Sequence, residues 1–290
     1  MDEFRIGTRK SALAMIQTRM ISDRIAQAYP NIPVKIVPCI TRGDVNLKSP
    51  LADFGGKGAF TAEIEQLLAE GRIDLAVHSA KDVPQEYDPS TEIISLLPRE
   101  DPSEVLLTIR NSGQNLLNIG TSSPRRQMLV KQFFPEASCS LLRGNVPTRI
   151  ARLRHGEYDG ILLALAGIKR LGLDHEDDLD YRIFPPTEFV PATCQGIIAV
   201  QIPRDGIHSQ LLRRLADETS QRQLLLEREI LRTLEAGCHD AVGVYTQIRA
   251  DKAHMTVLLE RNLKCCRCDF SVDLERLKDV PEIIRRKFGL

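Results

Sequence analysis

The chain has 290 residues, and its 39 lysines and arginines balance 39 aspartates and glutamates, so its formal net charge is zero. A chain without net charge is not held to nucleic acid by a general basic field. A hydrophobic content of 42% and a charged content of 27% are typical of a soluble globular protein, and this length corresponds to about two domains or three small ones.

Targeting and membrane signals are not apparent in the sequence. Residues 1–5 show no basic region followed by an apolar run, and the apolar stretch at 160–168 is far shorter than the roughly 20 residues that span a bilayer. Seven cysteines in a chain without an export signal are expected to be reduced thiols. The chain has no tryptophan and 5% aromatic residues, which disfavours stacking on bases. We therefore expect a cytoplasmic protein that binds neither membranes nor nucleic acid.

Strands and helices alternate in the first part of the chain. Ser11 is a candidate N-cap, and the apolar spacing after it predicts a helix that ends before Pro30. A second helix is predicted at 61–70, and apolar runs predict strands at 4–7, 32–40 and 73–78. Units of this kind predict a largely parallel sheet with right-handed crossovers.

The same alternation begins again after a proline-containing segment at 98–102. Helices are predicted from Pro124 to 133 and after the candidate N-cap Asn145, and strands at 116–120, 138–142 and 158–166. In the C-terminal part, from about residue 216, the sequence predicts a helix at 221–234, further strands and a last helix at 281–287. The segments at 98–102 and 185–191 indicate two chain crossings between two α/β domains, with a ligand in the cleft between them.

Cationic residues concentrate between 121 and 155, where Glu136 is the only acid. Gly120–Arg126 places hydroxyl side chains and two arginines at a helix N-terminus, where the helix dipole and free N–H groups favour an anion. Arginine is suited to bidentate contacts with carboxylates. A polycarboxylate or phosphate ligand is the direct inference, and a solvated surface is the alternative.

Two further segments offer chemistry. Lys81 and Asp82 directly follow the strand predicted at 73–78, and a carboxylate beside cations stays ionised and can stabilise a developing positive charge. A local ion pair in a turn is the alternative. Cys238 follows a predicted helix end, beside His239, and is a candidate nucleophile or covalent tether, or else a buried thiol.

A third cysteine-containing segment invites a metal interpretation. The spacing of Cys265, Cys266 and Cys268 does not suit a tetrahedral metal site, so a strand is the better prediction there.

Several motifs follow one another in order along almost the whole chain. They read GTRKSALA at 7–14, TRGD at 41–44, GGKGAF at 55–60, HSAKDVP at 78–84, GTSSPRR at 120–126, LRGNV at 142–146 and LEAGC at 234–238. In this order they resemble the motifs of the porphobilinogen deaminase family, also called hydroxymethylbilane synthases.

The resemblance implies a transferase that joins four porphobilinogen molecules head to tail, loses ammonia at each step and releases hydroxymethylbilane for tetrapyrrole (haem-type) biosynthesis. It implies a dipyrromethane primer bound through a thioether to Cys238, and a catalytic Asp82 that contacts pyrrole N–H groups and stabilises the cationic azafulvene. It implies a monomer that needs no metal. The residues that it implies for holding acetate and propionate groups, or for assisting the chemistry, are Arg9, Ser11, Lys81, Ser123, Arg125, Arg126, Arg143, Arg149 and Arg170.

The same resemblance implies an α/β fold of two domains like those of periplasmic binding proteins, joined by two crossings, plus a small C-terminal α/β domain that carries the cysteine. A mobile loop at 48–57 would cover the cleft, with Lys57 at its end and Phe60 just beyond it. We place domain 1 at 1–96 and 192–212, domain 2 at 97–191, and domain 3 at 213–290.

The chain departs from the family pattern at several positions. Cys194 stands where glycine is usual, Ala80 replaces a usual leucine, and Lys48 falls where an acid is common. Around the tether, the usual Gly-Gly-Cys-Gln-x-Pro is replaced here by Ala236, Gly237, Cys238, His239, Asp240 and Ala241. Two alternatives therefore stay open: a non-catalytic anion-binding module, and a paralogue of the same fold without the primer.

Overall fold

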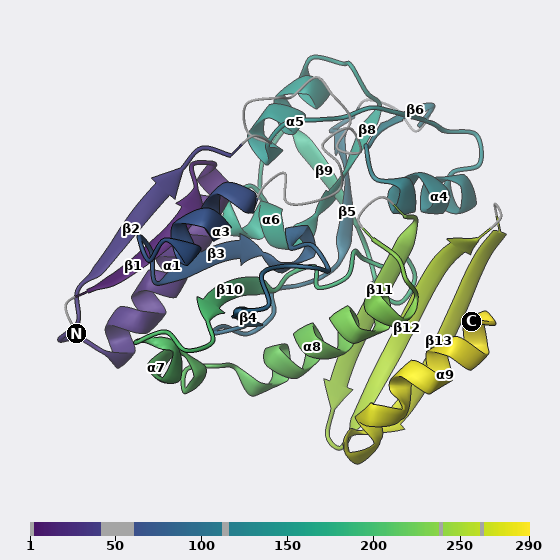
Figure 1. The fold of residues 1–290 in the computed structure, drawn as a ribbon. Coiled ribbons are helices and arrows are strands. Elements are labelled where there is room, and N and C mark those ends of the chain that lie inside the picture. Colours follow the sequence, from purple (N-terminus) through teal and green to yellow (C-terminus); the bar gives the residue numbers. More distant parts are fainter. Residues whose placement is uncertain (1–2, 42–60, 112–115, 238–239, 262–263) are drawn as a thin grey trace. The chain divides into compact units, whose positions relative to one another are not determined.

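The chain divides into two compact units, each described here by itself. The computed structural model describes residues 3–41, 61–111, 116–237, 240–261 and 264–290 (Figure 1). Unit 1 comprises Met1–Glu100 and Gly196–Leu225, and unit 2 comprises Asp101–Gln195 and Leu226–Leu290. The chain thus crosses at 100–101 and 195–196, and it passes into unit 2 again within α8 (Glu218–Thr233). The division into three domains stays a prediction.

Unit 1 contains a five-stranded sheet in the order β2-β1-β3-β10-β4. Strand β1 pairs in parallel with both β2 and β3, whereas β10 is antiparallel to both β3 and β4. The strand bounds are β1 Phe4–Arg9, β2 Val34–Cys39, β3 Leu75–Ser79, β4 Thr91–Ile94 and β10 Ile198–Pro203.

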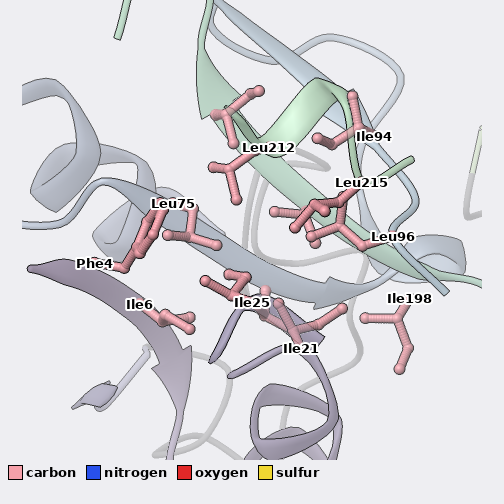
Figure 2. Close-up of a cluster of buried hydrophobic side chains, with 13 residues drawn as sticks. Phe4, Ile6, Ile21, Ile25, Leu75, Ile94, Leu96, Ile198, Leu212 and Leu215 are labelled. Carbon is pink, nitrogen blue, oxygen red and sulfur yellow. The ribbon is translucent and has the colours of Figure 1, made fainter. Parts of the chain in front are cut away.

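Helices cover both faces of this sheet. On one face, Ile21 and Ile25 of α1 (Ala12–Ala28) pack with β1 and β3, in a core that also includes Leu212 of α7 (Ser209–Arg213; Figure 2). On the other face, Ile64 of α3 (Ala62–Ala69) packs in a smaller cluster. Gly7 allows this close packing, because a Cβ there would lie 2.3 Å from Ile73 Cδ1.

Unit 2 repeats this strand arrangement, in the order β7-β6-β8-β5-β9. Here β6 is parallel to β7 and β8, and β5 is antiparallel to β8 and β9. The strands are β5 Glu104–Ile109, β6 Asn118–Gly120, β7 Ser138–Ser140, β8 Gly160–Ala164 and β9 Leu179–Phe184; the helices are α4 Pro124–Phe133, α5 Val146–Arg154 and α6 Leu165–Arg170.

A three-stranded antiparallel sheet of β11 (Val242–Arg249), β12 (Lys252–Arg261) and β13 (Lys264–Asp273) completes unit 2. Apolar residues of α8 and of α9 (Val280–Phe288), such as Ile230 and Ile284, pack in its core. The Cys265–Cys268 segment lies within β13, which confirms the predicted strand.

The predicted fold class is confirmed: two α/β sheets of one strand order, two crossings between them, and a small C-terminal sheet. The prediction of largely parallel sheets is wrong in one respect, because both sheets are mixed. The antiparallel strands β5 and β10 are the first strands after each crossing, so they enter their sheets from the other unit rather than through a strand–helix–strand turn. Among the described residues, no helix is long and apolar enough to cross a bilayer.

Candidate active site

A pocket in unit 1 lies where the parallel strands β1 and β3 end. It contains three of the predicted site residues, Arg9, Ser11 and Asp82. Side chains from β1, α1, β3 and the segments around them line it: Arg9, Ser11, Leu13, Ala14, Gln17, Thr61, Val77, His78, Ser79 and Asp82. The carboxyl ends of parallel strands are the usual place for a ligand site.

Asp82 offers an exposed carboxylate at this pocket. It ends the short 3₁₀ turn Ala80–Asp82, which is fixed by a hydrogen bond from Ala80 N–H to Ile197 O of 3.0 Å. Within the described ranges, no hydrogen bond or ion pair joins the Asp82 carboxylate to another group. The carboxylate is therefore available to N–H donors of a ligand. Lys81 precedes it in the same turn.

The helix α1 contributes a polar wall. The Ser11 hydroxyl accepts a hydrogen bond from Ala14 N–H at 3.3 Å, which confirms the predicted N-cap. Farther along the helix, the Gln17 carboxamide bonds the Ser79 hydroxyl, with an Nε2–Oγ distance of 3.0 Å. Gln17 and Ser79 were not among the predicted site residues, although both lie in or beside the motifs that carry the resemblance.

His78 lines the pocket as a buried, neutral imidazole. The pKa of His78 is lowered from 6.5 to about 4, chiefly by burial and in smaller part by the positive charge of Arg9, while a side-chain hydrogen bond with Gln201 opposes the shift. His78 therefore carries no charge near neutral pH. It was also not predicted as a site residue, since a sequence does not reveal which histidine becomes buried.

Arg125 and Arg126 of α4 are engaged by a buried acid in unit 2. Arg125 Nη2 lies 2.5 Å from Glu104 Oε1, and Arg126 Nη2 lies 2.7 Å from Glu104 Oε2. Glu104 is 0% exposed on β5. Each arginine also donates to a backbone carbonyl, at Val190 and Leu162 respectively. The Glu104 carboxylate therefore offsets one of the two positive charges that the sequence suggested for an anion site at this helix N-terminus.

The sequence interpretation of this helix N-terminus thus missed its internal counter-ion. Ser123 caps α4 by accepting from Arg126 N–H at 3.4 Å, as expected for a helix start. A ligand carboxylate at Arg125 or Arg126 would have to compete with Glu104, so their assignment to the substrate stays a prediction. The available signal was an acid placed directly before the apolar run 105–107.

The remaining predicted arginines of unit 2 lie around α5 and α6. Arg143 is half-buried before α5, and among the described residues its side chain has no hydrogen-bond or ion-pair partner. Arg149 Nε donates to Gly144 O at 2.8 Å, and Arg170 is the last residue of α6. Arg143 is therefore the cation of this set that is best placed to accept a new partner.

The tether region is described only on either side of the cysteine. Cys238 and His239 lie outside the described residues, as do Lys48, Lys57 and Phe60. Gly237 N–H donates to Asp240 Oδ2 at 2.7 Å, and Asp240 N–H donates back to Gly237 O at 3.1 Å. These two bonds hold the residues that flank Cys238 close to each other.

The backbone conformation of Cys194 explains why glycine is usual at this position in the family pattern. Its φ of +61° lies in the left-handed region, and its N–H donates to Glu227 Oε2 at 2.5 Å. At Gly196, φ is +90° and a Cβ would lie 2.1 Å from Glu100 O, so glycine is required there.

Within the described ranges, no group of histidine, cysteine and acidic residues is arranged to hold a metal ion.

A family model described as "Porphobilinogen deaminase, dipyromethane cofactor binding domain" matches residues 4–210. The chain belongs to the porphobilinogen deaminase family. The porphobilinogen deaminase of Acetivibrio thermocellus is 37% identical over 256 residues, which cover 88% of this chain and 86% of that protein. That of Stenotrophomonas maltophilia is 40% identical over 266 residues, covering 89% and 86%.

At the level of the family, these matches confirm the expected activity and dipyrromethane cofactor. Solved structures are more distant. The periplasmic aliphatic sulphonate binding protein SsuA of Escherichia coli is 13% identical with a TM-score of 0.41, over 81% of this chain and 71% of that one. A TM-score this low carries no argument about fold or function.

Proposed function

We propose that this family member is a transferase that condenses porphobilinogen stepwise onto a dipyrromethane primer tethered at Cys238, with loss of ammonia at each addition. The observation that carries the proposal is the Asp82 carboxylate, exposed at a pocket and without a partner among the described residues, beside Arg9 and Ser11. Such a carboxylate has its full charge available for a ligand.

Asp82 would act by electrostatic stabilisation. Departure of ammonia leaves positive charge on the pyrrole ring, and a fixed carboxylate lowers the energy of that charge. A carboxylate charge suits stabilisation of a cation better than donation of a proton. Its position on a turn held by Ala80 and Ile197 limits the reorganisation needed during the step.

The donor set suits a ligand that carries carboxylates and pyrrole N–H groups. Arg9, Ser11, Lys81, Arg143 and Arg149 would each be able to bind an acetate or propionate group, and Asp82 would accept N–H donors. The dipyrromethane group, when bound, would supply the free ring carbon to which the first unit is joined, and each later unit would join the last ring added. A thioether at Cys238 would keep it attached through repeated turnovers. We further propose a cytoplasmic monomer without a nucleic-acid partner.

Replacement of Asp82 by asparagine tests this proposal. Asp82→Asn keeps the shape of the side chain and removes its charge, so we expect the primer to remain and turnover to fall by about 10²-fold or more. Ammonia release and hydroxymethylbilane formation measure turnover, and intact mass measures the primer. The matched control is Asp23→Asn on the exposed face of α1, which should change neither.

The two alternatives predict different results in the same assays. An anion-binding module would bind porphobilinogen and release no ammonia, and a paralogue without primer would show the unmodified mass. Near-normal turnover in Asp82→Asn would contradict the role of the carboxylate.

A further inference from the structure

The loop between β7 and α5 carries Arg143, and side chains of the same unit hold its backbone on both sides of this residue. Before Arg143, the Tyr158 hydroxyl donates a hydrogen bond to Leu141 O at 2.7 Å. After it, Arg149 Nε donates to Gly144 O at 2.8 Å. The backbone from which the Arg143 side chain extends is therefore fixed by two side-chain donors.

The residues next to these bonds also restrict the loop. Leu142 is buried in the core of the unit. The φ of Gly144 is +112°, which side chains rarely allow, and a Cβ there would lie 3.1 Å from Thr148 Cγ2. Asn145 then caps α5, because its Oδ1 accepts from Thr148 N–H at 2.9 Å. The loop thus enters and leaves Arg143 in a defined conformation.

Tyr158 is held firmly by its own surroundings. It is 6% exposed and packs in the same core as Leu142. At Gly120, the last residue of β6, a Cβ would lie 2.8 Å from Tyr158 Cδ1, so the ring lies directly against the backbone there. The guanidinium of Arg152 stacks on the ring, with its Cζ 5.2 Å from the ring centroid. An enclosed ring leaves the hydroxyl little freedom to move away from the Leu141 carbonyl.

Arg143 itself makes no structural contact of the polar kind. Among the described residues, its side chain has no hydrogen-bond or ion-pair partner. An arginine loses conformational freedom when it binds a carboxylate, and that loss weakens binding. A backbone that is already fixed reduces the part of the loss that falls on binding. A residue that fixes the backbone beside Arg143 should therefore strengthen its contact with an anion.

We propose that Tyr158 is a positioning residue for Arg143, and that it acts through the hydrogen bond from its hydroxyl to Leu141 O. The inference rests on the proposed function, because that function makes Arg143 a binding residue for an acetate or propionate group. Tyr158 is buried and does not contact the ligand. Its hydroxyl determines where the Arg143 backbone lies before the ligand arrives.

Tyr158→Phe removes the hydroxyl and keeps the ring, so it separates the hydrogen bond from packing. We expect KM for porphobilinogen to rise about threefold to tenfold, as the loss of one neutral hydrogen bond predicts. We expect kcat to change by less than about twofold, because a contact made equally in the ground state and the transition state affects KM alone. Initial rates of ammonia release measure both constants.

A double-mutant cycle with Arg143→Gln distinguishes positioning from a general loosening of the fold. The probe is an analogue of porphobilinogen in which methyl replaces the aminomethyl group, so that variants with slow turnover can be compared as well. Once the guanidinium is removed, the hydroxyl has no charge left to position. Tyr158→Phe should therefore weaken the affinity about threefold to tenfold in the wild type, and less than about twofold in the Arg143→Gln background.

Tyr29→Phe is the matched control in unit 1. The Tyr29 hydroxyl donates to Leu211 O at 3.0 Å, so this variant loses the same kind of hydrogen bond at a place that carries no proposed ligand residue. Both tyrosine variants should lower the melting temperature by a few degrees. Only Tyr158→Phe should raise KM.

The outcomes separate this inference from the proposed function. A wild-type KM for Tyr158→Phe, or the same loss of affinity with and without the Arg143 guanidinium, would overturn the inference and leave the function standing. Wild-type affinity in Arg143→Gln would overturn the inference together with the carboxylate contact assigned to Arg143. A wild-type protein that has the unmodified mass and releases no ammonia would instead contradict the proposed function.

Discussion

At the scale of single residues, burial decides which polar groups remain available to a ligand. Asp82 is exposed and has no partner among the described residues, whereas Glu104 is buried between Arg125 and Arg126. The sequence shows these four charges without showing that difference, because the partner of Arg125 lies 21 residues away on another element. Asp82 could therefore be predicted as a site residue, and the ion-pair cluster could not.

His78 should make the stability of the protein depend on pH. Its pKa is lowered from 6.5 to about 4 by burial, so the unfolded chain binds more protons than the folded chain between these values. Stability therefore falls as the pH falls through this window, by roughly 2 kcal/mol at pH 5.

Urea unfolding of the wild type and of His78→Gln at pH 7 and pH 5 measures this pH-dependent loss of unfolding free energy. The wild type should lose more unfolding free energy than the variant over this interval, because glutamine does not titrate. Identical losses for the two proteins would contradict a neutral buried His78.

At the scale of elements, local signals predicted helices better than strands. Ser11, Ser123 and Asn145 each cap the helix expected after them, and α4 has the predicted bounds. Four strands, β4, β5, β9 and β10, were not predicted. Their positions are set by pairing with segments far away in the sequence, such as β10 with β3, and the antiparallel insertion after each crossing has no local signature.

The ion-pair cluster that joins β5 to α4 should be a determinant of stability. Glu104→Gln leaves two buried guanidinium groups without a counter-charge, and we expect a loss of about 3 kcal/mol in unfolding free energy. Chemical denaturation measures it. The control is Glu157→Gln, whose 44% exposed side chain pairs with Arg152 and should lower the unfolding free energy much less, because solvent screens an exposed pair. Equal, small effects would contradict a structural role for this cluster.

Arg143, before α5, should affect function rather than folding. It has no partner among the described residues, so Arg143→Gln should change the unfolding free energy by less than about 0.5 kcal/mol. Loss of a charge-assisted bond to a ligand carboxylate should lower kcat/KM about tenfold or more. Arg154→Gln, at the end of α5, is the control, because Arg154 is already paired with Asp178 and Glu176 at 2.7 Å. Normal elongation by Arg143→Gln would argue against the anion site.

At the scale of the whole molecule, the zero net charge is a sum of local excesses. The segment 121–155 is cationic and the segment 174–180 is acidic, and Arg154 pairs with acids of the latter. The duplicated sheet order and the two crossings agree with the expected architecture. The sequence could predict the two repeated cycles and the first crossing, because proline-containing segments and strand–helix cycles are local patterns. The strand order was not predicted, and the second crossing lies at 195–196, after the predicted segment 185–191. The balance of charges gives the chain no general basic field and still leaves individual cations, such as Arg143, for a carboxylate ligand.

The intact mass of the purified protein tests the central claim most directly. We predict a mass increased by one dipyrromethane, a colour reaction with Ehrlich's reagent, and a modified peptide that contains Cys238. The variant Cys238→Ser should show the unmodified mass, while Cys266→Ser, on the exposed part of β13, should retain the group. An unmodified wild type that releases no ammonia from porphobilinogen would contradict the claim.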